Sequence, residues 1–346
     1  MKKENSKKEK ERFEMMLSEE QEQFYIQQVK QKAAILKEIE IQTEAICLAA
    51  IKKTGDAIRY VKNQTPELCL AAVKRSAKAL RYVENQTEEL CLIAVKRSPE
   101  TLKWVKNQTL EVCLEAVRLN GETLKYVQVQ TEEICLAAVQ QRGWALEYVE
   151  KQTEEICLAA VKNYGSAVKY VREQTPKICL EAVKKDGNAL QYIKEKTPDV
   201  CLAAVKEKGW AIKYVKNQTL EMCLEVVKKE GVLLNYIKNK THVVCFEAVK
   251  ENGYSLYYIE NQTPTLCLEA IKEKADALEY VQTQNEELCL TALLNNVMVF
   301  SYIKSPTEEM ERIKTILTTS EPRSYQEIRY ALARHEIELT DSLIMC

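Results

Sequence analysis

The sequence predicts an all-α fold: an α-solenoid of twelve 22-residue, two-helix repeats with degenerate helical caps at both ends. Three observations predict it. Twelve of the thirteen cysteines recur every 22 residues, from Cys47 to Cys289. Tyrosine, or tryptophan in one copy, recurs at the same interval up to Tyr302, and threonine recurs from Thr43 to Thr263. A period of this length is typical of stacked repeats that share one continuous core.

Residues 131–152, TEEICLAAVQQRGWALEYVEKQ, show how one repeat is expected to form. Thr131 is the predicted N-cap of the first helix, because its hydroxyl accepts a hydrogen bond from the free N–H groups of the first turn. Threonine fills this slot in eleven copies and Asn285 fills it in the twelfth. The apolar residues from Ile134 to Val139 follow at helical spacing, and their wide stripe suits a helix with a neighbour on each side.

Gly143 is expected to end the first helix in the left-handed conformation, and all eight glycines of the chain occupy this slot. Ala77, Pro99, Ala275 and Val297 replace it in four copies. Because a non-glycine residue in that conformation costs about 1–2 kcal/mol, we expect an altered turn or strain at these four joints. The pattern after the glycine predicts a shorter second helix of about two turns, partly 3₁₀ in character.

The chain is expected to divide into four segments. Residues 1–20 form a charged N-terminal segment, frayed or disordered, and residues 21–42 form a degenerate capping repeat. Residues 43–306 form the twelve-repeat solenoid. Residues 307–346 form a C-terminal helical cap, which shields the last repeat as solenoids require.

Composition excludes several classes of protein. Apolar residues make up 46% of the 346 residues, charged residues make up 29%, and the formal net charge is −1, which does not indicate a polyelectrolyte binder. No apolar run is long enough to span a membrane and the N-terminus has no signal-peptide pattern, so we expect a cytoplasmic protein. The periodic cysteines are expected to be buried, reduced thiols, because packed helices lie too far apart for a ladder of disulfides.

We expect no enzyme activity. The sequence has no glycine-rich phosphate loop, no histidine-based triad, and no carboxylate pair distinct from the repeat. His242 and His335 are the only histidines, and no cysteine pair has the spacing of a zinc site. We therefore predict no catalytic residue, no cofactor and no metal.

Partner-binding residues are expected where the copies differ, because packing does not fix those slots. Large aromatic residues near the helix-to-helix turn are predicted to lie on one rim and to anchor a partner, and Arg142 is a further variable residue at this turn. These residues are Trp144, Tyr164, Trp210, Tyr254 and Arg142. The simpler interpretation is that each tryptophan covers the neighbouring turn.

A second candidate set is acidic. In the C-terminal half, glutamate takes a slot that is mostly alanine earlier in the chain, two residues after the cysteine. These residues are Glu181, Glu225, Glu247 and Glu269. If this slot lines the concave face, it offers an acidic groove to a basic protein or peptide.

Two further rows suggest nucleic acid as the alternative partner. The tyrosine ladder is explained either by partial burial or by a platform on which bases stack. A basic row follows the apolar stripe, and it either complements the helix dipole or tracks a phosphate backbone. The row consists of Lys52, Lys74, Lys96, Arg118, Lys162, Lys184, Lys206, Lys228, Lys250 and Lys272.

The repeat Thr-x-Glu-x-Cys-Leu-x-Ala-Val-Lys-x-x-Gly-x-Ala-Leu-x-Tyr-Val, over about residues 43 to 302, resembles the tandem units of the family called domain of unknown function 4116. The resemblance implies an all-helical interaction array and no catalysis. We therefore predict a non-catalytic scaffold that binds a protein or peptide along one face of a helical-repeat superhelix. Nucleic-acid binding is the alternative, no membrane is involved, and a monomer or weak homo-oligomer is expected.

Overall fold

A computed structural model describes residues 17–320, 325–335 and 337. Most of the predicted charged segment, residues 1–16, lies outside the described residues, as do parts of the predicted C-terminal cap. The described residues are α-helices alternating with short 3₁₀-helices, and they contain no strand. The chain divides into two compact units, Met1–Glu173 and Gln174–Cys346.

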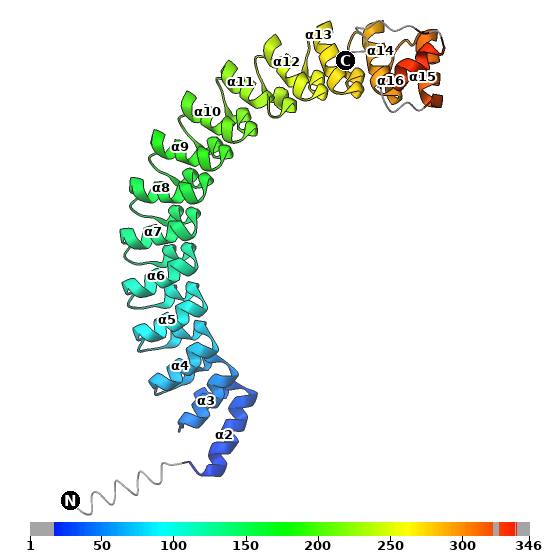
Figure 1. The fold of residues 1–346 in the computed structure, drawn as a ribbon. Helices are drawn as coiled ribbons and strands as arrows, with labels where there is room; N and C mark the ends of the chain where they lie inside the picture. Colours follow the sequence, from blue (N-terminus) through cyan, green and yellow to red (C-terminus); the bar gives the residue numbers. More distant parts are fainter. Residues whose placement is uncertain (1–16, 321–324, 336, 338–346) are drawn as a thin grey trace, which may run out of the picture. The chain divides into compact units, whose positions relative to one another are not determined.

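The first described helix of the first unit has Ser18 as its N-cap, which forms a reciprocal capping box with Gln21. The helices of its described residues, in chain order (Figure 1), are α2 (Glu19–Gln31), η1 (Ala33–Glu38), α3 (Glu44–Lys53), η2 (Gly55–Tyr60), α4 (Pro66–Arg75), η3 (Ala77–Tyr82), α5 (Glu88–Arg97), η4 (Pro99–Trp104), α6 (Leu110–Leu119), η5 (Gly121–Tyr126), α7 (Glu132–Gln141), η6 (Gly143–Tyr148), α8 (Glu154–Asn163) and η7 (Gly165–Tyr170).

The second unit continues the same alternation, and its last two described helices are both α-helices, of 13 and 9 residues. The helices of its described residues are α9 (Pro176–Lys185), η8 (Gly187–Tyr192), α10 (Pro198–Glu207), η9 (Gly209–Tyr214), α11 (Leu220–Val227), η10 (Gly231–Tyr236), α12 (His242–Glu251), η11 (Gly253–Tyr258), α13 (Pro264–Glu273), η12 (Ala275–Tyr280), α14 (Glu286–Asn295), η13 (Val297–Tyr302), α15 (Glu308–Ser320) and α16 (Tyr325–Ala333). None of the helices described in either unit is long and apolar enough to cross a bilayer.

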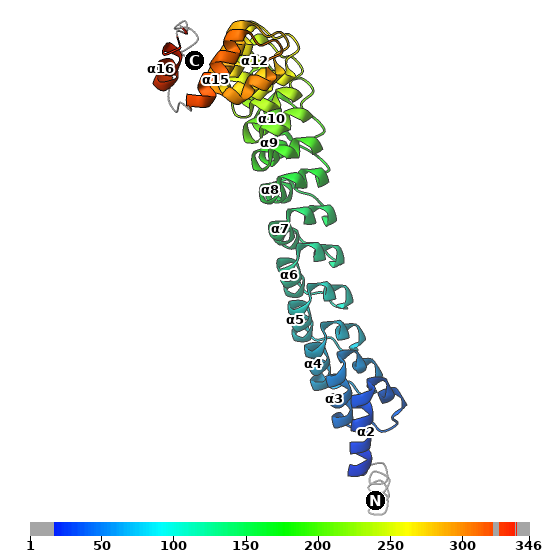
Figure 2. The ribbon, with the colours of Figure 1, turned by 90° about the vertical axis from the view of Figure 1, so that its right-hand side faces the viewer.

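Within each unit the repeats form two layers. Neighbouring α-helices lie side by side in one layer and neighbouring 3₁₀-helices lie side by side in the other (Figures 1 and 2). An α-helix packs against the 3₁₀-helix of its own repeat and against that of the preceding repeat. Twelve such pairs, from α3 and η2 to α14 and η13, follow one another along the described chain. The predicted all-α solenoid of 22-residue repeats is confirmed.

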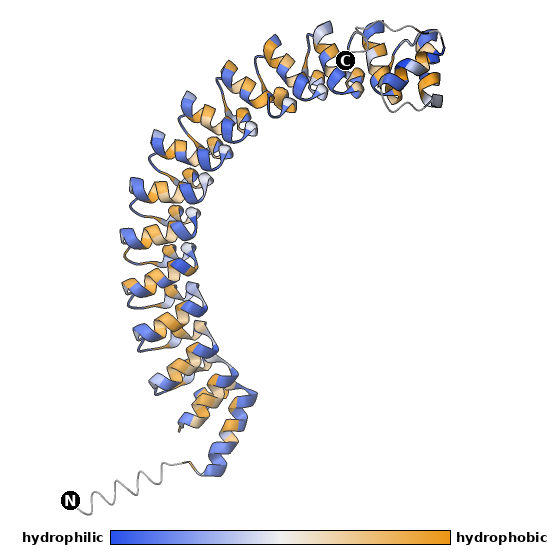
Figure 3. Ribbon diagram, viewed as in Figure 1, coloured by the Kyte–Doolittle hydropathy of each residue, from blue (hydrophilic) through white to orange (hydrophobic). Residues whose placement is uncertain are grey.

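The core of each repeat is the apolar stripe predicted from the sequence. In the specimen repeat, Ile134, Cys135, Ala138 and Val139 are all buried, and the 3₁₀-helix adds Leu146. All twelve periodic cysteines are buried and unpaired, as predicted. Hydrophobic residues run through the helices of each unit, and hydrophilic residues gather at the turns and helix ends (Figure 3).

The α-helices begin as predicted. The Thr131 hydroxyl accepts a hydrogen bond from the backbone N–H of Ile134 at 3.3 Å, and Asn285 caps Leu288 in the same way at 2.9 Å. The exception is Thr197, whose side chain makes no capping hydrogen bond and which is followed directly by a proline. Caps of this kind satisfy N–H groups that have no partner within the helix.

The predicted left-handed cap at glycine was wrong. The α-helix ends at Gln141. The next residue, Arg142, has an extended backbone with φ −149° and ψ 109°, and Gly143 has no left-handed φ but opens the 3₁₀-helix. Glycine is needed for a different reason. A Cβ at Gly143 would lie 2.7 Å from the carbonyl oxygen of Ala160 in the next repeat. The glycine slot therefore permits close approach of consecutive repeats.

The altered turns predicted at the four joints without glycine were also wrong. Ser76 precedes Ala77 with φ −149° and ψ 114°, and Lys274 precedes Ala275 with φ −147° and ψ 113°, both close to the values at Arg142. The turns before Pro99 and Val297 are likewise extended. The four residues that replace glycine open a 3₁₀-helix, as Gly143 does, so their side chains do not alter the turn. The irregular joint is instead at α11, where the residue after the helix, Lys228, stays in the right-handed helical region.

In most repeats a glutamine just before the capping residue joins consecutive repeats. The Gln130 amide donates to the carbonyl of Tyr148 at 2.8 Å and accepts from the backbone N–H of Glu150 at 3.0 Å. The Cys135 thiol lies 3.5 Å from the same amide oxygen. The pair of backbone contacts recurs at Gln42, Gln64, Gln86, Gln108, Gln152, Gln174, Gln218, Gln262 and Gln284.

Candidate interaction surface

The 3₁₀-helices give each unit a surface whose composition varies from repeat to repeat. In η6, Ala145 and Leu146 are buried, whereas Trp144 and Glu147 are exposed and Tyr148 is half-buried. From η2 to η12 the third and fourth residues are buried, the fifth is exposed and the sixth is half-buried, whereas the second is exposed in some repeats and half-buried in others. We call the second, fifth and sixth residues of these helices the 3₁₀ surface. Its second and fifth residues are free to vary because they contribute little to the core.

Three of the predicted partner-binding residues form one cluster in the first unit. The rings of Trp144 and Tyr164 meet edge to face with their centroids 4.9 Å apart. They are nevertheless 41% and 47% exposed, so much of this aromatic area is open to a partner. The Arg142 guanidinium lies 5.9 Å from the Trp144 ring and also pairs with Glu122 at 2.9 Å.

Trp210 forms a second cluster, in the second unit. Its indole N–H donates to the Glu230 carboxylate at 3.0 Å, and its ring lies 5.5 Å from the Tyr236 ring of the next repeat. The Lys213 ammonium lies 5.9 Å from the same indole. Trp210 is 38% exposed, so these contacts fix the orientation of the ring without burying it.

Tyr254 belongs to a third cluster, also in the second unit. Its ring lies 6.1 Å from that of Tyr280 and carries the Lys274 ammonium at 4.9 Å. Tyr257, which the sequence analysis did not single out, bridges Tyr258 at 5.1 Å and Tyr280 at 5.4 Å and is 66% exposed. The signal in the sequence was the adjacent pair Tyr257 and Tyr258 in GYSLYY. Tyr258 belongs to the tyrosine row that recurs every 22 residues, and Tyr257 was overlooked beside it. The predicted single rim remains a prediction, because the aromatic residues form three clusters in two units.

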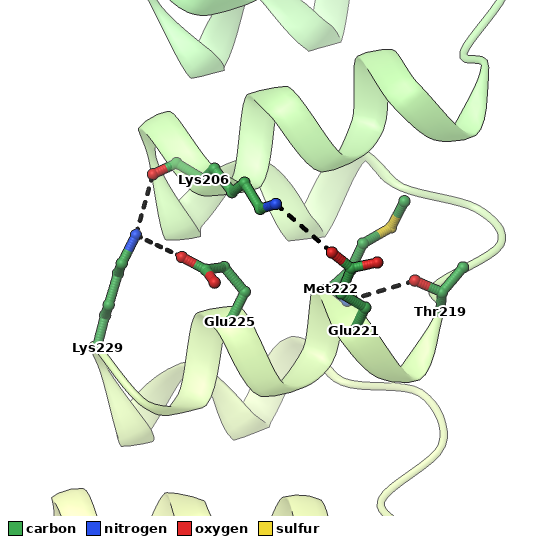
Figure 4. A network of polar contacts seen from close by, with 6 residues as sticks. All are labelled: Lys206, Thr219, Glu221, Met222, Glu225 and Lys229. Atoms are coloured by element: carbon green, nitrogen blue, oxygen red, sulfur yellow. Dashed lines mark hydrogen bonds and ion pairs between the residues drawn. The ribbon is translucent and has the colours of Figure 1, made fainter.

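The predicted glutamate row lies on the α-helices and not on the 3₁₀ surface. Glu225 pairs with Lys229 at 2.7 Å, and this hydrogen bond holds the pKa of the Glu225 carboxyl below its usual value (Figure 4). Glu181 pairs with Lys184 at 3.4 Å. Glu247 and Glu269 are half-buried at the equivalent slot. Lysines of the same repeats therefore neutralise part of the row.

The predicted basic row lies near the C-terminal ends of the α-helices. Its side chains are exposed there, and Lys206 reaches Glu221 of the next repeat at 3.5 Å (Figure 4). The Lys229 ammonium donates to the carbonyl of Lys206 at 3.1 Å, which satisfies a group at the helix end. The basic row and the tyrosine ladder therefore lie on different helices of the repeat.

A different set of cations accompanies the ladder rings in the first unit. The Arg59 guanidinium lies 4.6 Å from the Tyr60 centroid and 5.5 Å from the Tyr82 centroid. Arg81 stands in the same way between Tyr82 at 4.4 Å and Trp104 at 5.6 Å. We define the cation–aromatic ladder as Arg59, Tyr60, Arg81, Tyr82, Lys103, Trp104, Lys125, Tyr126 and Tyr148. Sequence analysis noted its rings but missed its cations, which directly precede the rings.

Comparison with known proteins identifies the repeat. The family model described as Domain of unknown function (DUF4116) matches three times in tandem, at residues 109–152, 131–174 and 176–220. Residues 109–220 are therefore similar to tandem DUF4116 repeats. Each DUF4116 match spans about two of the 22-residue units, so the family description takes in a pair of stacked repeats. No curated protein and no solved structure matches the chain.

Proposed function

We propose that this DUF4116-repeat chain is a non-catalytic scaffold that binds a protein partner along its 3₁₀ surface. The observation that carries the proposal is the set of aromatic side chains that pack on one another outside the core. Trp144, Tyr164 and Tyr257 are between 41% and 66% exposed and still make ring contacts. Rigid, partly exposed aromatic residues dominate the binding energy of protein interfaces.

The slots themselves support this proposal. The second position of the 3₁₀-helix holds Trp144 and Trp210 in two repeats but Asp56, Lys78 and Val232 in others. The fold forms with any of these residues, so stacking does not require a tryptophan there. Clusters that ring contacts hold in place also lose less side-chain entropy when a partner binds. Twelve unpaired thiols suit a reducing cytoplasm, where we place the scaffold.

The experiment compares capture of partners by the full chain and by two variants, Trp144→Ala and Trp210→Ala. Val232→Ala is the matched control, because Val232 takes the same slot and is also exposed. We expect each tryptophan variant to lose at least one partner that Val232→Ala retains, with unchanged circular dichroism. Identical sets of partners at identical yields from all four proteins would contradict the proposal.

Nucleic-acid binding is the second candidate, and the cation–aromatic ladder is the observation that favours it. Cations and rings together are typical of surfaces that hold single strands. Such binding weakens steeply with salt because counterions are released from the phosphates. Titration of the full chain with single-stranded RNA at rising salt tests it, and no binding at low salt would exclude it.

A further inference from the structure

We propose that the cation–aromatic ladder of the first unit is a binding site for an extended acidic peptide that places one carboxylate on each repeat. This inference rests on the proposed function, protein binding along the 3₁₀ surface, and gives one part of that surface a ligand. Its starting point is the regular alternation of exposed cations with half-buried rings over four consecutive repeats.

The rings hold the cations in fixed places. Lys103 lies 4.5 Å from the Trp104 centroid and 5.8 Å from the Tyr126 centroid, and Lys125 stands between Tyr126 and Tyr148 at 5.1 and 5.7 Å. The negative face of an aromatic ring attracts a cation at such distances even at an exposed site. A cation that is already positioned loses less conformational freedom on binding an anion.

Most of the ladder's positive charge is available. Arg81 pairs with Asp56 at 3.0 Å. Arg59 donates instead to the hydroxyls of Tyr60 and Tyr82, at 2.5 and 3.3 Å. Among the described residues no carboxylate forms an ion pair with Arg59, Lys103 or Lys125. Three of the four cations are therefore free to meet carboxylates of a partner.

The rings favour a peptide over a nucleic acid. Tyr82 has both Arg59 and Arg81 over its ring, and Trp104 has both Arg81 and Lys103. A nucleobase binds such a surface by stacking on an open ring face, so it would first have to displace these cations. A carboxylate binds the cation itself and does not require an open ring face, and an arginine can donate two parallel hydrogen bonds to it.

The spacing indicates an extended chain. The Arg59 guanidinium lies 4.6 Å from one ring centroid and 5.5 Å from the next, so these centroids are no farther apart than the sum of the two distances, about 10 Å. A polyproline II chain advances roughly 9 Å per turn of three residues. An acidic residue at every third position of such a chain therefore keeps neighbouring carboxylates within that limit.

The site is confined to part of the array. The slot that holds Arg59, Arg81, Lys103 and Lys125 holds Glu147 in the next repeat, where the continuous run of cations ends. In the second unit the slot is cationic at Lys213 and otherwise neutral or acidic. Lys213 lies 4.9 Å from the Tyr214 ring centroid, so it makes the same cation–ring contact at a single repeat outside the cation–aromatic ladder. It therefore serves as a control for a lysine that lacks neighbouring cations in the same slot.

The test uses fluorescence anisotropy of a labelled peptide of about 15 residues that repeats Glu-Ala-Pro, a sequence that favours polyproline II. The comparison ligands are an isomer with its glutamates in one block and single-stranded oligouridine. The proteins are the full chain, the double variant Lys103→Glu/Lys125→Glu, the charge-preserving Lys103→Arg/Lys125→Arg, and Lys213→Glu.

We expect the double charge reversal to weaken peptide binding at least about tenfold, while the arginine pair and Lys213→Glu bind like the unchanged chain. The block isomer should bind several times more weakly than the regular peptide. Three results would each overturn the inference: no binding at low salt, equal affinity for the double reversal and the unchanged chain, or tighter ladder-dependent binding of oligouridine.

The two proposals fail in different ways. If Trp144→Ala and Trp210→Ala lose their partners but the peptide does not bind, the ladder inference alone is wrong. If the peptide binds through the ladder while neither tryptophan variant loses a partner, the aromatic clusters are not the anchors and the ladder stands. Circular dichroism of the double variant checks that a lost signal does not reflect unfolding.

Discussion

Gly187 lies at a point of close approach between its own repeat and the next one. A Cβ at this position would meet the carbonyl oxygen of Ala204 at 2.5 Å and the Lys208 Cβ at 2.8 Å. Gly209 occupies the same slot one repeat later, but its nearest neighbour there is the flexible end of Leu233 at 3.0 Å. The difference follows from the early end of α11, which leaves no backbone carbonyl among the closest contacts of Gly209.

These two glycines give a matched pair of substitutions. We expect Gly187→Ala to lower the free energy of unfolding by about 1–3 kcal/mol, because a backbone carbonyl must move to admit the methyl group. Gly209→Ala should lower it by less than about 1 kcal/mol, because only a side chain has to rotate. Urea denaturation followed by circular dichroism measures both. Equal losses would show that the close approach does not determine the choice of glycine.

Sequence reasoning at this scale succeeded where one residue type has one role. Thr131 was predicted as a cap and Cys135 as a buried thiol, and both predictions were confirmed. Gly143 was assigned the wrong role, because a left-handed turn and a close backbone approach select the same residue. Only coordinates distinguish the two, since the atom that excludes a Cβ belongs to the next repeat.

Between consecutive repeats, the glutamine that precedes most of the capping residues forms a bridge. Gln218 donates to the carbonyl of Tyr236 at 2.8 Å and accepts from the N–H of Lys238 at 2.9 Å. At Lys196 and Lys240 the slot holds lysine instead, and the Lys196 ammonium reaches only the Ile193 carbonyl of its own repeat. The array thus contains natural joints with and without this amide.

We expect Gln218→Ala to destabilise the chain by about 1–3 kcal/mol, because two backbone groups lose their partner. Lys196→Ala removes a side chain at the equivalent slot that makes no bridge, so its effect should stay within about 0.5 kcal/mol. Hydrogen exchange of the neighbouring amides measures the opening of each joint. If Lys196→Ala opened its joint as much as Gln218→Ala, the amide bridge would have no special role.

The helix pair was predicted at this scale, but its joints were not. The spacing of apolar residues predicted an α-helix followed by a shorter helix, and the second proved to be a six-residue 3₁₀-helix in every repeat. The sequence did not indicate the glutamine bridge, because the partners of the glutamine lie 18 and 20 residues further along the chain. For the same reason the sequence did not show that each ladder cation contacts two rings, one of them in the next repeat.

Over the whole molecule, the effect of burial on the pKa of a thiol occurs once in each of the twelve repeats. Burial raises the pKa of the twelve periodic thiols, to about 11 at Cys47, Cys91 and Cys135. A thiol whose pKa is higher in the folded chain than in the unfolded chain stabilises the fold fully below the unfolded value, near 9. That contribution is lost as the pH rises from about 9 towards 11, where the unfolded chain releases protons that the folded chain retains.

We therefore expect the urea midpoint to fall steeply above about pH 9. Each thiol that is ionised only in the unfolded chain lowers the free energy of unfolding by about 1.4 kcal/mol per pH unit. A variant with alanine at Cys47, Cys91 and Cys135 should show a shallower fall than the unchanged chain. Identical slopes for the two proteins would show that these thiols do not govern the alkaline limit.

The central claim is that consecutive repeats bury the same side chains against one another, and counting reactive thiols in the native chain tests it most directly. The chain has thirteen cysteines, of which twelve are buried in the stacked repeats and Cys346 lies outside the described residues. Alkylation at neutral pH followed by mass spectrometry should modify no more than one thiol before unfolding and all thirteen after it. Rapid modification of several periodic cysteines in the folded chain would contradict the stacked core.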